Sequence, residues 1–346
     1  MNLSLFDYHL PAELIAYSPT RRRDSSRLLI LDRKSGRIEH RKFSSIVDYL
    51  GKGDGLIIND TKVFKARLFA RRESGGKVEL FLLEEVESSE MCCWKVLTHP
   101  TKRVKEGEEL IFDEKSRILI VKKHPDGRTT VGFKSKAEAK RIISKFGHVP
   151  LPIYIHRPDR KLDESRYQTV YANAKKARAV AAPTAGFHFS KGILEKIRAK
   201  GVKIIPITLH VGYGTFKTIR TDNIEDHSID AEYVEISKTS AAAINRIRQK
   251  GGRIFVVGTT SVRALESAQT KAGKLQAYSR YVDLYIRPGH NFKFVDHLIT
   301  NFHLPRSSLL ILVSAFVGRE KILEAYRIAV EEKYRFYSYG DCMLIL

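Results

Sequence analysis

The sequence is poor in cysteine and contains no long hydrophobic stretch. Its three cysteines, Cys92, Cys93 and Cys342, cannot form a disulfide framework, and no Cys-x-x-Cys spacing is present. The longest apolar run, Leu309–Val317, is far shorter than the roughly 18 residues needed to cross a bilayer. The segment Met1–Leu10 lacks the basic stretch and apolar block of a secretory signal. We therefore expect a cytoplasmic protein without a membrane partner.

Acidic residues are scarce relative to basic ones. The 346 residues include 61 Lys and Arg but only 39 Asp and Glu, which gives a formal net charge of +22. A field of this size attracts polyanions, of which nucleic acid is the commonest. A generally basic proteome, or lysine enrichment for growth at high temperature, would produce the same excess. The charge therefore indicates a nucleic-acid partner without distinguishing binding from catalysis.

The length and the pattern of elements indicate two domains of different type. A chain of 346 residues suggests about two domains. Between Lys65 and Phe133 nearly every segment is typical of a short strand bounded by turn residues. Further along, predicted strands and helices alternate, as in α/β layer structures. We expect an α/β fold with a mixed-sheet main domain, 1–64 and 151–346, and an inserted small all-β, barrel-like domain, 65–150. A division into three domains is the alternative.

The individual elements follow from hydrophobic periodicity, capping residues and turn residues. Strands are predicted at 27–31, 56–59, 66–70, 78–83, 94–98, 109–112, 118–122, 129–133, 202–209, 254–257 and 309–313. Helices are predicted at 44–50, 135–146, 190–200, 237–250, 262–268 and 320–334. The strand at 309–313 is inferred from its continuous apolar character.

Polar segments follow two of the predicted strands, at the position where open α/β sheets bind ligands. Asn59-Asp60-Thr61-Lys62 follows the strand 56–59, although Asn, Asp and Thr also cap turns and helices. The segment His210–Phe216 follows the strand 202–209 and places Tyr213 between two glycines. This arrangement suits a cleft for a flat substrate, and a glycine-rich hairpin turn would look the same.

The segment Ala181–Phe189 combines small residues with a histidine between two aromatics. Small residues allow the backbone to approach a ligand closely, and His188 is a candidate acid–base or stacking group. The alternative is a tightly packed loop with a structural histidine.

In the C-terminal segment Tyr334–Asp341, four aromatics and an arginine suit base stacking, but packing against the core is an equal alternative.

The segment Gly258–Arg263 lies between a predicted strand and a predicted helix. Free N–H groups at a helix N-terminus, together with hydroxyl groups, bind carboxylates or phosphates. A capping box ending at Glu266 would account for part of the pattern without a ligand. The segment matches neither the P-loop nor the dinucleotide-binding motif.

The histidines His188, His210, His227 and His303 lack the spacing of a zinc protease, so we expect no metal.

Segments spread over nearly the whole chain carry a family resemblance. They are Asp7–Pro11, Pro19–Leu29, Asn59–Val63, Ala66–Leu68, Gly147–Pro152, Tyr167–Tyr171, Ala179–Phe189, His210–Phe216, Gly258–Arg263, Glu266-Ser267, Thr300–Pro305 and Tyr334–Asp341. Together they closely resemble the S-adenosylmethionine:tRNA ribosyltransferase-isomerase family of queuosine biosynthesis. The resemblance implies transfer and isomerisation of the ribosyl group of S-adenosylmethionine onto 7-aminomethyl-7-deazaguanine in the tRNA wobble position. Epoxyqueuosine-tRNA, adenine and methionine would be the products, without a metal.

The resemblance also implies the partners and a set of site residues. S-adenosylmethionine would act as ribosyl donor, and the RNA would be a tRNA with a GUN anticodon (Asp, Asn, His and Tyr types) acting with a monomeric protein. The expected catalytic residues are Asp60, His188, His210 and His303. The expected substrate-binding residues are Lys62, Thr184, Phe187, Tyr213, Thr259, Thr260, Ser261, Arg263 and Glu232. Among these, Arg263 would pair with the methionine carboxylate, and Phe187 and Tyr213 would stack on a base.

The chain departs from the family pattern at one position. Where the family often has Met-His-x-Glu, this sequence has Ile229-Asp230-Ala231-Glu232, so that Asp230 replaces the histidine. Either that histidine is dispensable or Asp230 performs its task. Two other functions remain open: a non-catalytic RNA-binding protein, and an S-adenosylmethionine-dependent RNA methyltransferase. The basic residues of the insert would hold the RNA backbone, or form a solvated surface: Lys102, Arg103, Lys105, Lys115, Arg117, Lys122, Lys123 and Arg128.

Overall fold

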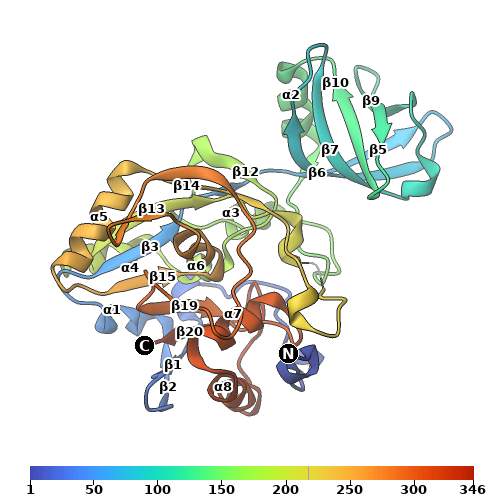
Figure 1. The fold of residues 1–346 in the computed structure, drawn as a ribbon. Coiled ribbons are helices and arrows are strands. Elements are labelled where there is room, and N and C mark those ends of the chain that lie inside the picture. Colours follow the sequence, from blue (N-terminus) through green and yellow to red (C-terminus); the bar gives the residue numbers. More distant parts are fainter. Residues whose placement is uncertain (217) are drawn as a thin grey trace. The chain divides into compact units, whose positions relative to one another are not determined.

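The computed structural model describes residues 1–216 and 218–346, which form two compact units (Figure 1). The main unit comprises Met1–Lys62, Gln168–Lys176 and Ala182–Leu346. The barrel unit comprises Val63–Tyr167 and Ala177–Ala181. Each unit has its own sheet and its own buried side chains. We propose that the two units are separate domains, with the predicted limits of the insert, 65 and 150, extended to those of the barrel unit.

A mixed sheet forms the centre of the main unit, which confirms the predicted α/β class. Its strand order is β18-β14-β13-β3-β15-β19-β20-β1-β2. The strands are β1 (Arg27–Leu31), β2 (Ile38–Lys42), β3 (Gly55–Asn59), β13 (Lys203–Leu209), β14 (Glu232–Ile236), β15 (Ile254–Val257), β18 (Tyr278–Val282), β19 (His297–Asn301) and β20 (Cys342–Ile345). The central strands β13, β3, β15 and β19 are parallel to one another, whereas β20 runs antiparallel to β19.

The helices of the main unit are α1 (Ile46–Tyr49), α4 (Lys191–Ala199), α5 (Lys238–Gln249), α6 (Thr259–Glu266), α7 (Ser308–Val317) and α8 (Arg319–Glu331). Helices α4, α5 and α6 pack against the sheet, and α7 packs against α8. The α4 side chains Ile193 and Ile197 pack with alternate residues of β1, β3, β15 and β20 in one apolar core. Ser190 and Ser237 accept hydrogen bonds from backbone N–H groups at the N-termini of α4 and α5, as their sequence predicts.

Short elements complete the main unit. They are the 3₁₀ helices Leu3–Phe6, Ala12–Leu14, Arg23–Ser25, Phe43–Ser45, Ala174–Lys176, Thr184–His188, Tyr213–Phe216 and Ile224–Asp226, and the hairpin strands β16 (Thr270–Lys271) and β17 (Lys274–Leu275). The side chains of Thr215 and Phe216, which end the predicted His210–Phe216 segment, lie outside the described part of the chain.

The strand predicted at Leu309–Val313 is wrong, because these residues lie in the helix α7. The Oγ of Ser307 accepts a hydrogen bond from the Leu310 N–H and so caps the helix. Most α7 side chains are buried, and the helix has no polar face that would reveal a helical period. A continuous apolar run cannot distinguish a buried helix from a buried strand.

A closed antiparallel barrel forms the second unit, as the turn-bounded strand pattern predicts. Its strands are β5 (Arg67–Arg72), β6 (Lys77–Val86), β7 (Cys92–His99), β8 (Glu109–Asp113), β9 (Ser116–Lys123) and β10 (Arg128–Phe133). They follow the order β5-β6-β7-β10-β9-β8, and pairing of β8 with β5 closes the barrel. The other elements of this region are the 3₁₀ helix Thr101–Arg103, α2 (Lys136–Phe146), α3 (Lys161–Arg166), β11 (Gly147–His148) and the pair β4 (Lys62–Val63) and β12 (Ala177–Ala179).

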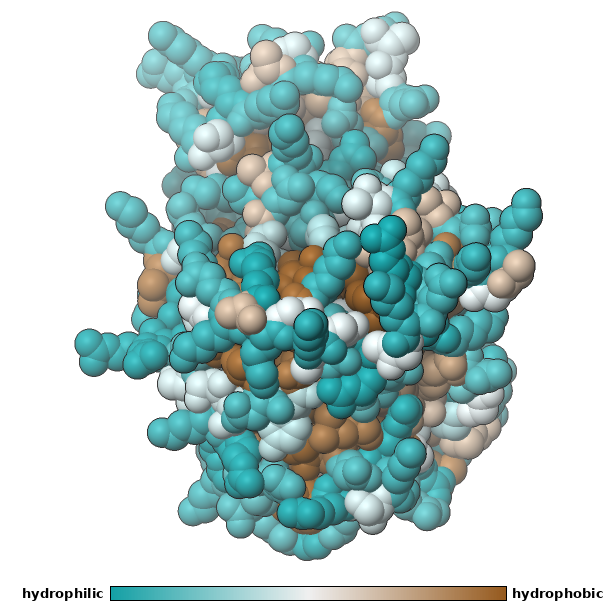
Figure 2. Space-filling view, turned by 90° about the vertical axis from the view of Figure 1, so that its left-hand side faces the viewer, coloured by the Kyte–Doolittle hydropathy of each residue, from teal (hydrophilic) through white to brown (hydrophobic). Residues whose placement is uncertain are grey.

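One face of the molecule is mainly hydrophilic (Figure 2). Figure 2 shows one face of the molecule, on which hydrophilic side chains predominate and apolar side chains show in smaller areas between them. Among the described residues, no helix combines the length and apolar character that crossing a bilayer requires.

Candidate functional site

The candidate site lies at one edge of the central sheet. Because β13, β3, β15 and β19 are parallel, their carboxyl ends meet at the same edge. Four of the predicted segments begin there: Asp60 follows β3, His210 follows β13, Gly258 follows β15, and Phe302-His303 follows β19. The fold therefore assembles at one place segments that are widely separated in the sequence.

A first hollow lies beside α6 and opens to solvent. Its volume is about 460 Å³ when the space at the opening is counted. Its lining residues are Gly214, Ile229, Asp230, Glu232, Thr260, Arg263, Leu284, Tyr285, Ile286, Ser308, Leu309 and Leu312. Gly258 precedes α6 with φ of 86°, a left-handed conformation that suits glycine. This conformation lets the chain turn sharply from β15 into the helix whose side chains face the hollow.

Arg263 is an ion-pair partner within the protein as well as a candidate ligand group. Its Nη1 donates to Oε2 of Glu232, and its Nε donates to the carbonyl of Leu284 at 3.1 Å. The second carboxylate oxygen of Glu232 accepts from the Gly212 N–H at 2.9 Å. The Nη2 of Arg263 is buried and has no hydrogen-bond partner among the residues that the structure describes. The guanidinium is thus oriented by two contacts and keeps one donor for a ligand.

The three hydroxyl residues at the start of α6 differ in their contacts. Thr259 and Thr260 line hollows, and within the described part of the chain the buried Oγ1 of Thr260 has no hydrogen-bond partner. Ser261 instead donates to the Val257 carbonyl at 2.6 Å and lines neither hollow. The proposed capping box is absent, because the Glu266 carboxylate accepts from the N–H groups of Lys293 and Phe294. Thr260 is the hydroxyl best placed to meet a ligand.

A second hollow adjoins the first. Its volume is about 520 Å³, again counting the space at its opening to solvent. The two share Thr260 and Leu309 in their walls. The second is lined by Ala182, Pro183, Thr184, Ala185, Val211, Gly258, Thr259, Thr260, Thr300, Asn301, His303, Leu309, Tyr337 and Ser338. Its lining combines small apolar residues with hydroxyl groups, the Asn301 amide and His303, and among the described residues it contains no Asp, Glu, Lys or Arg. An uncharged hollow therefore adjoins one that is lined by Asp230, Glu232 and Arg263.

His303 is a buried, neutral histidine in the wall of the second hollow. Its Nδ1 lies 3.3 Å from the Tyr326 hydroxyl, and its Nε2 lies 3.4 Å from the Thr300 hydroxyl. Burial lowers the pKa of His303 to about 3, so the ring is uncharged at neutral pH. A neutral imidazole can donate one hydrogen bond to a ligand and accept another.

His188 lies behind the second hollow and does not line it. Its Nδ1 lies 2.8 Å from the Ser26 hydroxyl, and the Asn301 amide nitrogen lies 3.2 Å from its Nε2. The side-chain oxygen of Asn301 accepts from the Thr184 hydroxyl at 3.2 Å. Burial lowers the pKa of His188 to about 3. Both ring nitrogens of His188 are engaged within the protein.

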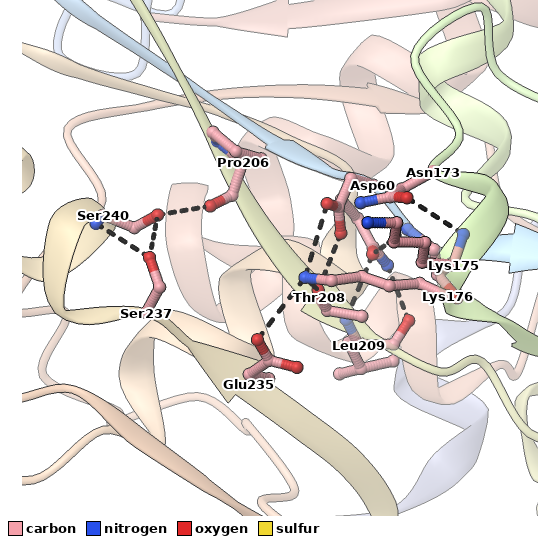
Figure 3. Close-up of polar contacts among 12 residues, drawn as sticks. Asp60, Asn173, Lys175, Lys176, Pro206, Thr208, Leu209, Glu235, Ser237 and Ser240 are labelled. Atoms are coloured by element: carbon pink, nitrogen blue, oxygen red, sulfur yellow. Dashed lines mark hydrogen bonds and ion pairs between the residues drawn. The ribbon is translucent and has the colours of Figure 1, made fainter.

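Asp60 belongs to a polar cluster that includes a lysine we did not predict from the sequence (Figure 3). One carboxylate oxygen accepts from the Thr208 hydroxyl at 2.7 Å, and the other lies 3.4 Å from Nζ of Lys176. Lys176 also lies 3.6 Å from Glu235 and donates to the Thr208 hydroxyl. Neighbouring Asn59 has a structural role. Its side-chain N–H donates to the Leu209 carbonyl, and its side-chain oxygen accepts from the Leu209 N–H.

The other predicted residues lie around this edge without lining either hollow. The Nδ1 of His210 lies 2.8 Å from the Thr61 hydroxyl, and its ring stacks on Tyr233. Phe187 is buried, with its ring 5.8 Å from that of Tyr339. Tyr213 and Lys62 are half-buried.

Tyr285 is a site residue that sequence reasoning missed. It lies beyond β18 in the segment Leu284–Ile286, whose Leu284 carbonyl binds Arg263. Its buried hydroxyl has no hydrogen-bond partner in residues 1–216 and 218–346, and burial raises the pKa of Tyr285 to about 12. No local motif marks this tyrosine, because only the fold brings it to α6. In the described part of the chain, no group of three His, Cys, Asp or Glu residues is arranged to hold a metal ion.

The fold and these hollows define an α/β protein of the kind that binds a small molecule at the carboxyl edge of its sheet. A family model described as queuosine biosynthesis protein matches residues 3–345, and the chain belongs to this family.

The full-length relatives described next have the same name. The S-adenosylmethionine:tRNA ribosyltransferase-isomerase of Halothermothrix orenii is 46% identical over 348 residues, and that of Pelotomaculum thermopropionicum is 47% identical over 350 residues. Both alignments cover 100% of this chain and of the relative. The crystal structure of S-adenosylmethionine tRNA ribosyltransferase from Thermotoga maritima has a TM-score of 0.57 and 38% identity, covering 99% of this chain and 100% of that one.

Proposed function

We propose that this chain transfers and isomerises the ribosyl group of S-adenosylmethionine onto 7-aminomethyl-7-deazaguanine at the wobble position of tRNA. The products are epoxyqueuosine-tRNA, adenine and methionine. The observation that carries the proposal is the full-length identity of 46–47% to enzymes named S-adenosylmethionine:tRNA ribosyltransferase-isomerase. The two adjoining hollows at the sheet edge provide room for an elongated donor with a charged end and a nucleoside end.

The nucleoside end of the donor occupies the second hollow. Small residues, Ala182, Pro183 and Ala185, form an apolar wall for a flat purine. His303 lines this hollow as a neutral ring. We assign its Nε2–H, whose contact to the Thr300 hydroxyl is long at 3.4 Å, as hydrogen-bond donor to the departing adenine. Phe187 and Tyr213 remain our proposed stacking residues at the same edge.

Proton removal from C5′ of the donor requires a base of ordinary strength, because the adjacent sulfonium acidifies this position. Asp60 and His210 are the candidates, since both follow strands that end at this edge. His188 has both ring nitrogens engaged, and its contact to Asn301 supports a positioning role in place of the predicted catalytic one.

The RNA partner in this proposal is a tRNA with a GUN anticodon, and the protein acts as a monomer in the cytoplasm. The net charge of +22 supports an RNA partner. Exposed basic side chains of the barrel unit, Lys102, Arg103 and Lys105, would contact phosphates. Splayed anticodon-loop bases would provide the specificity.

Product analysis tests the proposal. The full chain is incubated with S-adenosylmethionine and an anticodon stem-loop that carries 7-aminomethyl-7-deazaguanine. We expect free adenine and methionine, with a matching gain in RNA mass. S-adenosylhomocysteine as product would indicate a methyltransferase instead. RNA binding with the donor left intact would indicate a non-catalytic RNA-binding protein. A stem-loop carrying guanine at the wobble position is the matched control and should remain unmodified.

A further inference from the structure

Tyr326 is a buried tyrosine of α8 that makes two contacts to His303. Its hydroxyl oxygen accepts from the backbone N–H of His303 at 2.9 Å and lies 3.3 Å from Nδ1 of the same residue. Burial raises the pKa of Tyr326 above its usual range, so the hydroxyl keeps its hydrogen at neutral pH. This hydrogen is the only one that the hydroxyl can donate.

Two arrangements of the hydrogens fit these positions. In the first, the hydroxyl donates to Nδ1, and the neutral ring of His303 carries its hydrogen on Nε2. In the second, Nδ1–H donates to the hydroxyl, whose own hydrogen then has no acceptor among the residues that the structure describes. Tyr326 is 0% exposed and lines neither hollow, so a ligand does not supply the acceptor either. A buried donor without an acceptor costs free energy, which favours the first arrangement.

The other ring nitrogen lies beside a hydroxyl group of the second hollow. Nε2 of His303 is 3.4 Å from the Thr300 hydroxyl, and both residues line this hollow. The distance is long for a hydrogen bond, so Nε2–H is only weakly engaged within the protein. In the first arrangement the hydroxyl hydrogen of Thr300 also needs an acceptor. Both spare donors therefore belong to residues that a ligand in the second hollow can contact.

Neighbouring side chains hold this pair in place. The Tyr8 hydroxyl donates to the carbonyl of His303, and the Tyr8 ring packs edge-on against Tyr326 at a centroid distance of 5.1 Å. The ring of Phe302 lies 5.4 Å from that of Tyr326. Since Tyr8 belongs to the segment Asp7–Pro11, this part of the family resemblance supports the position of His303.

We infer that Tyr326 is a positioning residue, which fixes His303 as the tautomer with its hydrogen on Nε2 and so presents a hydrogen-bond donor to the second hollow. The inference rests on the proposed function, which it deepens by naming the residue that makes His303 a donor to adenine. Ring nitrogens of adenine accept hydrogen bonds, and such a donor stabilises the charge that develops on adenine as it departs. The other tautomer would present a lone pair to these nitrogens and repel them.

Nitrogen NMR of the full chain with isotope-labelled histidine tests the tautomer without tRNA or donor. Protonated and unprotonated ring nitrogens differ in chemical shift, and comparison with His303→Gln assigns the His303 signals. We expect a protonated Nε2 and an unprotonated Nδ1 in the unchanged protein, and a mixture of both tautomers in Tyr326→Phe. The control Tyr334→Phe removes a hydroxyl that lies 2.7 Å from Nδ1 of His40, so it should change the His40 signals and leave the His303 tautomer as it is.

Kinetics with the modified stem-loop test the consequence for the reaction. Glutamine in place of His303 can place an N–H near the position of Nε2, but it has no tautomers. We expect Tyr326→Phe to lower kcat about five- to tenfold in the unchanged protein and less than about twofold in His303→Gln. A merely structural role of Tyr326 would lower kcat equally in both backgrounds.

Three results would overturn the inference. They are a hydrogen on Nδ1 of His303 in the unchanged protein, a ring that stays fully protonated at Nε2 in Tyr326→Phe, and equal losses of kcat in the two backgrounds. Thermal unfolding detects a folding defect, and the spectrum of the unchanged protein tests the tautomer even if Tyr326→Phe does not fold. If Tyr326 is found to fix the tautomer but no adenine is released with the modified stem-loop, the proposed function fails while the role of Tyr326 stands.

Discussion

At the scale of single residues, His188 shows how a buried histidine acts through its neighbours. Asn301 can only donate through its amide nitrogen, so Nε2 of His188 accepts and Nδ1–H donates to Ser26. The oxygen of Asn301 is then fixed toward the Thr184 hydroxyl. The amide nitrogen of Asn301 also donates to the carbonyls of Tyr337 and Asp341. Since Asn301 and Thr184 line the second hollow, His188 contributes with these carbonyls to fixing which groups of the amide the ligand meets.

We therefore predict that His188→Ala raises the KM for S-adenosylmethionine by about five- to tenfold, the cost of one lost buried hydrogen bond. Asn301→Ala should have a similar effect, and the double variant should be no worse than either single one. Steady-state kinetics over a range of pH would measure this. If His188 were a catalytic base, kcat of the unchanged protein would fall at low pH as the ring is protonated. Disappearance of this fall in His188→Ala would contradict a positioning role.

The same burial makes stability depend on pH. The pKa of His188 and of His303 is about 3 in the folded protein, against 6.5 for an ordinary histidine. Between these values the unfolded chain binds more protons, so the free energy of unfolding rises with pH and falls on acidification below about 6.5. Urea unfolding at about pH 7 and about pH 5 should show this loss, with a shallower dependence in His188→Gln. The same substitution at exposed His156 should leave the pH dependence unchanged.

At the scale of elements, α7 links local capping to the site. The Oγ of Ser307 accepts from the Leu310 N–H at 3.2 Å, and Leu309 and Leu312 of this helix line the first hollow. The Ser307 hydroxyl also donates to the Leu304 carbonyl at 2.7 Å. We predict that Ser307→Ala lowers the free energy of unfolding by about 1 kcal/mol, whereas Ser307→Thr retains most of the stability because its hydroxyl can cap the helix and donate to the same carbonyl. Chemical denaturation would measure both. Equal losses in the two variants would show that the cap is not the source of the stability.

Elements were predictable where the sequence carries local signals. The barrel strands follow from turn residues such as Asp126-Gly127, and α4 and α5 from the serines at their N-termini. The α7 segment gave no such signal, because an apolar run is compatible with both structures. The sequence predicted that the site lies at the edge of the sheet where the strands end. It did not predict which side chains contact one another there. Tyr285 and Lys176 reach it through tertiary packing alone.

At the scale of the whole molecule, the net charge of +22 is unevenly neutralised. In the barrel unit, Arg117 pairs with Glu109 and Arg128 pairs with Asp126. Lys123 binds the carbonyls of Thr101 and Val104 and so holds the 3₁₀ helix Thr101–Arg103 against the end of β9. These contacts divide the predicted basic set into residues already engaged and residues whose charge faces solvent.

The second group should dominate RNA binding. Lys102, Arg103 and Lys105 are exposed, and none of them forms an ion pair with a residue that the structure describes. Each phosphate contact releases counterions, so its loss reduces the slope of log K against log salt by roughly 0.7–0.9. We predict that replacing all three by alanine lowers the slope for tRNA by about 2, whereas alanine at Arg117 and Arg128 lowers it less. Filter binding of tRNA at several salt concentrations measures this. Equal slopes in the two variants would place the phosphate contacts elsewhere. The affinity for S-adenosylmethionine should be the same in both variants, since none of these residues lines a hollow at the sheet edge.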